Sequence, residues 1–195
     1  MSNKFLGNIA LLGAPFLLLG IYTETVVSSL SDSWFTGVWG MLYITGWMAS
    51  MIVLQRMEAA GAGKFGRMLI SMIIFSLAIA NASNVVKLIS ANDKPSFFFY
   101  IDLCWPFSNV LMLVLGITIM IKKSLPAPTR WIPLACGLWL PLAMLSMVVL
   151  GKTLAGLFFA GSYSVIFWAL LARMVRKVPD HKIEEELLDT TVSII

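Results

Sequence analysis

Residues 68–90 read MLISMIIFSLAIANASNVVKLIS, a stretch of 23 residues with a single charge, Lys87. A helix of this length, at 1.5 Å rise per residue, crosses the roughly 30 Å hydrocarbon core of a bilayer. The rest of the chain contains five similar stretches, at residues 5–23, 36–55, 98–121, 131–150 and 153–173. Helices satisfy their own backbone hydrogen bonds, as lipid requires. The sequence therefore predicts an all-α, polytopic integral membrane protein, with a bundle of six transmembrane helices in one domain, residues 1–177.

The overall composition supports the same class. Of the 195 residues, 59% are hydrophobic, and the mean hydropathy is +0.88. A single soluble core of this size could not bury so much apolar surface, so the lipid bilayer is the first expected partner. The net charge of +4 is not arranged as a basic patch interleaved with stacking aromatics, so we expect no nucleic-acid partner.

The basic residues predict the orientation. If six helices alternate in direction, eleven of the fourteen Lys and Arg residues fall on one side. These are Lys4, Arg56, Lys64, Arg67, Lys122, Lys123, Arg130, Arg173, Arg176, Lys177 and Lys182. By the positive-inside rule this side is cytoplasmic, and both termini lie there. The tail, residues 178–195, contains an acidic run at residues 184–186 and is predicted to be cytoplasmic as well.

Several kinds of chemistry lack the residues they need. The only histidine, His181, lies in the tail, so no imidazole is available within the bundle for a metal or haem. Cys104 and Cys136 fall on different helices without CxxC spacing, and we interpret them as packing residues rather than as a disulfide. We therefore expect no metal site and no cofactor.

Lys87 and Asp102 are the only charged residues within the predicted helix bodies rather than at their ends. A charge inside a membrane span is costly unless it is paired or hydrated, so it often indicates a functional site. The short connection between the third and fourth predicted helices makes them antiparallel neighbours, which places Lys87 and Asp102 at similar depth in the outer leaflet. The sequence predicts that they pair. The structural alternative is that Lys87 extends to the interface and Asp102 caps the fourth helix.

Further polar residues accompany this pair. Asn84 lies on the flank of the stripe that contains Lys87, and Asn109 shares a helix face with Asp102. Together they predict an outward-facing polar pocket between the third and fourth helices. The candidate ligand-binding residues are Asn84, Lys87, Asp102, Trp105, Ser108 and Asn109.

Three functions remain open on these residues. The first is binding or transport of a small solute or lipid-like ligand in this pocket. The second is a structural or assembly role, in which small-residue faces pack against another membrane protein or a second copy of the chain. The third is an intramembrane enzyme with Asp102 as acid or base and Ser108 as nucleophile. It is disfavoured because Ser108 lies about 120° from Asp102 around the helix axis, at about 100° per residue, and has no adjacent base.

Prolines and tryptophans also predict local features. Pro15 and Pro106 fall near the middle of their spans, where proline removes a backbone hydrogen bond and kinks the helix. They would occupy matching positions in two inverted three-helix halves, but the side chains of the halves show no convincing similarity. Four tryptophans near span ends are interpreted as interfacial anchors, namely Trp34, Trp39, Trp131 and Trp168.

Overall fold

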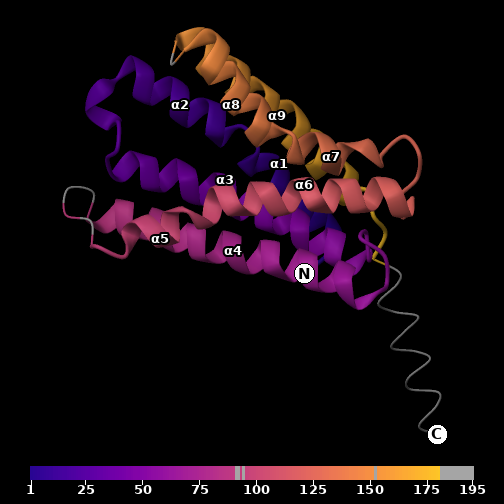
Figure 1. Cartoon of the computed structure of the whole chain (residues 1–195). Helices are drawn as coiled ribbons and strands as arrows, with labels where there is room; N and C mark the ends of the chain where they lie inside the picture. Colours follow the sequence, from indigo (N-terminus) through magenta and orange to yellow (C-terminus); the bar gives the residue numbers. More distant parts are fainter. Residues whose placement is uncertain (91–92, 94, 152, 181–195) are drawn as a thin grey trace, which may run out of the picture.

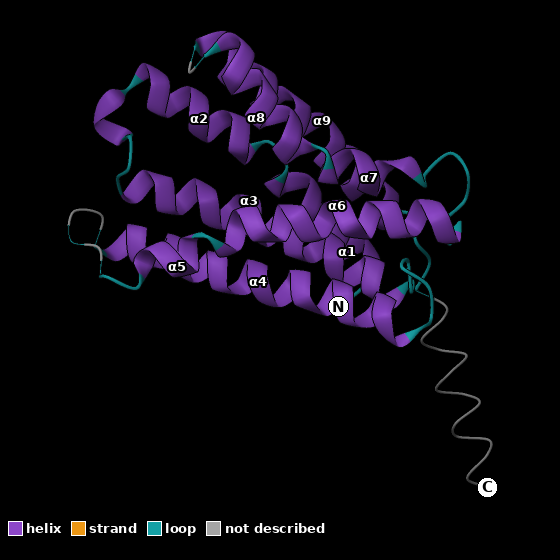
Figure 2. Ribbon diagram, viewed as in Figure 1, coloured by secondary structure: helices purple, strands orange, loops and turns teal. Residues whose placement is uncertain are grey.

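The computed structural model describes residues 1–90, 93, 95–151 and 153–180, and the predicted acidic run of the tail lies outside these residues. The described residues form helices and no strand (Figure 2). In chain order the elements are α1 (Asn3–Gly13), α2 (Phe16–Val26), the 3-10 turn η1 (Ser28–Leu30), α3 (Trp34–Arg56), α4 (Lys64–Ile89), α5 (Phe98–Asp102), α6 (Cys104–Lys122), α7 (Trp131–Gly137), α8 (Trp139–Leu150) and α9 (Leu154–Arg176).

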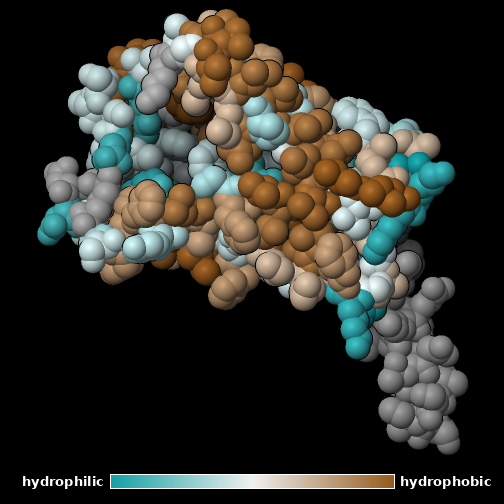
Figure 3. Space-filling model, viewed as in Figure 1, coloured by the Kyte–Doolittle hydropathy of each residue, from teal (hydrophilic) through white to brown (hydrophobic). Residues whose placement is uncertain are grey.

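Five helical segments among the described residues are long and apolar enough to cross a membrane. They are residues Asn3–Val26, Trp34–Arg56, Lys64–Ile89, Phe98–Lys122 and Leu154–Arg176, and the bent pair α7 and α8 makes a sixth if it counts as one span. On the visible face of the molecule, apolar side chains cover the middle and hydrophilic ones gather towards the two ends (Figure 3). This distribution indicates a multi-pass membrane protein.

The helices pack so that α3 lies near the centre. It contacts α1 and α4 extensively, α4 packs on α6, α6 on α7, and α9 on α1, α2 and α8 (Figure 1). The N-terminus lies beside the ends of α3 and α9, because Arg56 Nη1 donates to the Met1 carbonyl and the Asn3 backbone N–H donates to Asp180. Both chain ends of the bundle therefore meet at one end of the molecule.

Three prolines divide the predicted spans. Proline has no N–H to donate to the carbonyl four residues earlier, and its ring clashes with that turn. The chain accordingly breaks next to Pro15, between α1 and α2, and at Leu103, three residues before Pro106, between α5 and α6. The third break, at Leu138, three residues before Pro141, separates α7 from α8 and bends the fifth predicted span by 43°. The sequence predicted the first two kinks, whereas it presented residues 131–150 as one continuous helix.

Glycines allow the closest helix crossings. A Cβ added to Gly13 on α1 would lie 2.7 Å from the Cα of Gly46 on α3, and one added to Gly46 would lie 2.8 Å from the Cα of Gly13. The contact at this crossing is therefore backbone against backbone. In a membrane, where lipid is as apolar as the helices, such close packing is a main source of association energy.

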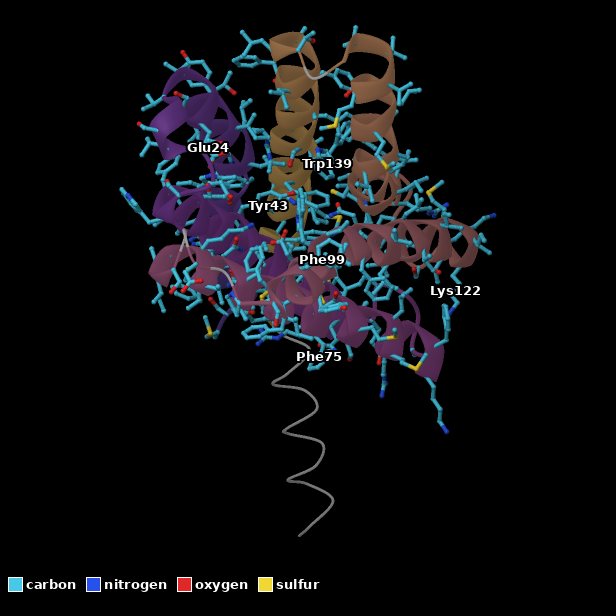
Figure 4. All side chains as sticks on the ribbon, turned by 60° about the vertical axis from the view of Figure 1, so that its left-hand side comes forward. Glu24, Tyr43, Phe75, Phe99, Lys122 and Trp139 are labelled. Carbon is cyan, nitrogen blue, oxygen red and sulfur yellow. The ribbon has the colours of Figure 1, made fainter. Side chains whose placement is uncertain are left out.

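One predicted interfacial anchor is a core residue instead. Trp168 on α9 is 5% exposed, and its ring lies 4.9 Å from that of Trp47 and stacks on Tyr43 at 6.5 Å. The prediction was wrong because a tryptophan near a span end can face the interior as well as the lipid, and position along the helix does not distinguish the two. Figure 4 shows Tyr43 and Trp139 inside the bundle and Phe75 on its surface, in agreement with exposures of 2%, 6% and 69%.

Candidate functional site

A cavity of about 110 Å³ lies between α3, α4 and the α5–α6 break. α3 and α4 supply most of its lining, and the break supplies Asp102 and Trp105. The full lining is Thr36, Trp39, Gly40, Tyr43, Ile44, Ala80, Ser83, Asn84, Lys87, Asp102 and Trp105. This space is large enough to hold several water molecules. Four of the six residues predicted from the sequence therefore line one cavity.

The predicted ion pair forms at the rim of this cavity. Lys87 Nζ donates to Asp102 Oδ1 over 3.0 Å, and the Ser83 hydroxyl lies 2.9 Å from the same oxygen. The Lys87 side chain is 15% exposed and that of Asp102 44%. Lys87 also lies over the ring of Phe98, with its ammonium 5.4 Å from the ring centroid. Asp102 is the last residue of α5, and its carboxylate bonds to the side chains of Lys87 and Ser83 on α4, so it pairs across the helices rather than capping one.

Asn84 forms part of the buried floor of the cavity. It is 5% exposed, and its side-chain oxygen occupies the space that a Cβ on Gly40 would need, at 2.5 Å. Gly37, one turn earlier on α3, similarly approaches the backbone carbonyl of Asn84. The two glycines allow α3 to lie directly against the polar face of α4. They therefore decide how much room remains beside Asn84.

Ser108 and Asn109 lie outside the cavity, although the sequence grouped them with it. Both are fully buried. The Ser108 hydroxyl donates to the Cys104 carbonyl over 2.7 Å, which also accepts from Ser76 on α4 at 2.9 Å. The Asn109 amide nitrogen donates to the Trp105 carbonyl over 3.0 Å. These hydrogen bonds join successive turns of α6 and link α6 to α4, and the Ser108 hydroxyl donates to a backbone carbonyl rather than to Asp102.

The α3 side of the cavity was missed in the sequence. Thr36, Trp39, Gly40 and Tyr43 recur at helical spacing on one face, and this combination of polar, aromatic and small residues was a usable signal. Glu24, at the end of α2, accepts hydrogen bonds from the Thr36 hydroxyl and from Trp39 Nε1, the latter over 2.9 Å. A second carboxylate therefore lies next to the cavity and holds two of its lining side chains.

The cavity offers hydrogen bonding rather than metal ligation. Within the part of the chain that the structure describes, no group of three or more His, Cys, Asp or Glu side chains could hold a metal ion. Both cysteines are free. The indole Nε1 of Trp105 is buried without a hydrogen-bond partner among the described residues. Such a donor is costly to leave unpaired. Trp47 and Trp168 each have another such buried Nε1, and of the three tryptophans Trp105 is the one that lines the cavity.

Comparison with known proteins adds no relative. The chain matches no protein-family model, no curated protein and no solved structure.

Proposed function

We propose that this protein is a six-span membrane protein with both termini in the cytoplasm, which binds or transports a small polar solute through the cavity at Lys87 and Asp102. The alternating helix directions and the bias of basic residues support the orientation. The α7–α8 pair is then a single broken span. The ion pair lies towards the side opposite the termini, since Asp102 is at the end of the bundle that holds the connection between α4 and α5.

The orientation predicts which loops can be labelled from outside the cell. With Cys104 and Cys136 replaced by alanine, Ser29→Cys in η1 should react with a membrane-impermeant maleimide in intact cells. Gly63→Cys, on the opposite end of the bundle, should react only after the cells are permeabilised. Both positions are exposed, so a difference reflects location. If Gly63→Cys instead reacts in intact cells and Ser29→Cys does not, the proposed orientation is wrong. If both cysteines react equally in intact cells, α3 does not cross the membrane between them.

The observation that supports solute binding best is the half-solvated ion pair beside an unpaired buried donor. Asp102 has one oxygen, Oδ1, bonded to Lys87, while its other oxygen has no partner among the described residues. Together with Trp105 Nε1 and the Asn84 amide, the cavity offers donors and acceptors at one small space. A solute of about four to six non-hydrogen atoms fits the volume, and hydrogen bonds to the cavity would replace those it loses on leaving water.

The test uses small polar probes on the purified chain in detergent. Glycine, acetamide and glycerol are each titrated while the midpoint of thermal unfolding is followed, and at least one should raise it. Trp105→Phe keeps the ring and removes the N–H, and should weaken the effective probe about tenfold, the equivalent of one hydrogen bond. Asp102→Asn should weaken it as well.

Trp131→Phe is the matched control, because Trp131 is 43% exposed on α7 and lies outside the cavity lining. It should leave the response to the probe unchanged. The proposal fails if no probe stabilises the wild-type chain, or if the two tryptophan variants respond alike.

Among the described residues, no distinct contact surface supports the alternative, in which the protein is an assembly subunit. Exposed apolar side chains occur on α8, for example Val148 at 82% and Val149 at 70%, but similar side chains face outwards on the other spans too. Lipid covers such surfaces as well as a partner does. The cavity is the more specific feature.

A further inference from the structure

A groove of about 670 Å³ runs between α1 and α9, separate from the solute cavity. Four of its lining residues are basic and four are apolar. They are Lys4, Arg173, Arg176 and Lys177, and Leu11, Ile166, Ala169 and Leu170. α1 and α9 touch along this groove, since a Cβ on Gly7 would lie 2.5 Å from the Cα of Arg176. The missing side chain at Gly7 thus lets the arginine lie directly against α1.

The two kinds of lining residue are separated along the groove. Lys4 lies in the first turn of α1, and Arg173, Arg176 and Lys177 lie at the end of α9, where the two chain ends meet. Leu11 is two turns further along α1, and Ile166, Ala169 and Leu170 are one to two turns earlier on α9. The groove is therefore cationic at the end of the bundle and apolar towards its middle.

The four cations are available for a ligand. All four residues are exposed, and none makes a side-chain hydrogen bond or ion pair among the residues that the structure describes. The carboxylate of Asp180, at the same end of the bundle, accepts from the Asn3 backbone N–H over 2.7 Å. Four like charges this close repel one another, so an anion bound among them would relieve the repulsion.

Four other basic residues at the same end already make contacts within the protein. Arg67 pairs with Glu58, and Lys122 Nζ donates to the Ala60 carbonyl over 3.0 Å. Arg56 and Arg130 likewise donate to backbone carbonyls. The free cations of the groove thus differ from four of the six other described basic residues at this end, which make contacts within the protein.

From this arrangement we propose that the α1–α9 groove is a binding site for an anionic phospholipid. Its phosphate lies among Lys4, Arg173, Arg176 and Lys177, and one acyl chain lies along Leu11, Ile166 and Leu170. Guanidinium groups bind phosphate oxygens in a bidentate manner, and basic pockets between transmembrane helices are suited to anionic headgroups. A free phosphate would use the cations but not the apolar half, whereas a phospholipid uses both.

The test measures lipid binding to the purified full chain by native mass spectrometry, with titrations of dioleoyl phosphatidylglycerol and dioleoyl phosphatidylcholine. The two lipids share acyl chains and differ in headgroup charge. The wild-type chain should prefer phosphatidylglycerol at least tenfold. Since each basic group contributes about fivefold in affinity for anionic lipid, Arg173→Gln with Arg176→Gln should lower the affinity for phosphatidylglycerol about 25-fold and leave phosphatidylcholine unchanged.

The matched control is Lys64→Gln with Lys123→Gln. These two lysines also lie at this end of the bundle, make no side-chain hydrogen bond or ion pair among the described residues and do not line the groove. The control should bind phosphatidylglycerol within twofold of the wild type. An equal loss in the two double variants would overturn the site, because it would mean that any surface charge attracts the lipid.

A second variant tests the apolar half. Ala169→Trp fills the groove without changing its charge, so it should lower phosphatidylglycerol binding at least tenfold. Inorganic phosphate should compete only weakly with the lipid. Competition by phosphate at the lipid's own concentration would overturn the proposal in favour of a simple anion site. A further variant changes Glu184, Glu185 and Glu186 to Gln. If phosphatidylglycerol binds only to this variant, the proposal is also wrong, because the chain's own acidic run would then be the occupant of the groove.

The outcome is independent of the solute proposal. The groove and the cavity have no lining residue in common. The arginine variants should therefore respond to glycine, acetamide or glycerol as the wild type does.

Discussion

Gly46→Leu should lower the midpoint of thermal unfolding by about 10 °C, the largest effect that we expect from one substitution. For a chain of this length, about 3 to 4 kcal/mol corresponds to such a shift. Overpacking in a well-packed core costs about 1 to 3 kcal/mol and occasionally more, and here the added carbon meets backbone. Gly13 on α1 cannot rotate away as a side chain could, because its Cα is the atom at 2.8 Å.

Helix propensity acts in the opposite direction and is too weak to prevent this result. Leucine is favoured over glycine in a helix interior by about 0.8 kcal/mol. The free-energy cost of the steric clash at the α1–α3 crossing exceeds this gain several-fold. The net effect should therefore be strongly destabilising, although the substitution improves the local helix sequence and adds apolar surface.

Gly63→Leu provides the control for this experiment. Gly63 precedes α4, has no heavy atom within 4 Å of an added Cβ, and has an ordinary negative φ of −69°. Its leucine variant should melt within about 2 °C of the wild type, which corresponds to about 0.5 kcal/mol. Size-exclusion chromatography after heating in detergent measures both. Similar melting of the two variants would mean that the α1–α3 crossing does not limit stability.

Asp102→Ala should destabilise the chain by about 2 kcal/mol, the second-largest effect. It leaves the Lys87 ammonium, 15% exposed, without its counter-charge. Breaking a fully buried pair from one side costs about 3 to 5 kcal/mol. The cost here is lower because Asp102 is 44% exposed, so water screens part of the charge. Removing the more exposed partner therefore harms the fold more than removing the buried one.

The reverse substitutions test this asymmetry. Lys87→Ala leaves the half-exposed carboxylate and should cost about 1 kcal/mol, and Lys87→Ala with Asp102→Ala should cost less than the sum of the single variants. Glu58→Gln with Arg67→Gln is the comparison, because that pair is exposed at 63% for Arg67 and 37% for Glu58. It should cost less than about 0.5 kcal/mol. If the loss of stability in the double variant equals the sum of the losses in the two single variants, Lys87 and Asp102 do not stabilise each other.

The sequence was sufficient for the helical class and for the pairing of Lys87 with Asp102. Apolar length is a local property, and so is the effect of Pro15 and Pro106 on the helices that contain them. The pairing followed from a short connection, which leaves two consecutive helices little choice but to lie antiparallel. The break at Leu138 could have been inferred too, since Pro141 lies four residues beyond Gly137, the last residue of α7.

The sequence alone established an apolar, helical, multi-pass chain with one charged pair in its spans, because hydrophobic length and charge position are properties of each segment by itself. Only the tertiary structure decided that Asn109 and Ser108 are sealed between helices while Thr36 and Tyr43 line the cavity. It also decided that Trp168 faces the core and that Lys4 joins Arg173 across a groove. Each of these depends on how a helix is rotated against its neighbours. That rotation is set by close contacts such as Gly13 against Gly46 and Gly7 against Arg176, which join residues far apart in the chain.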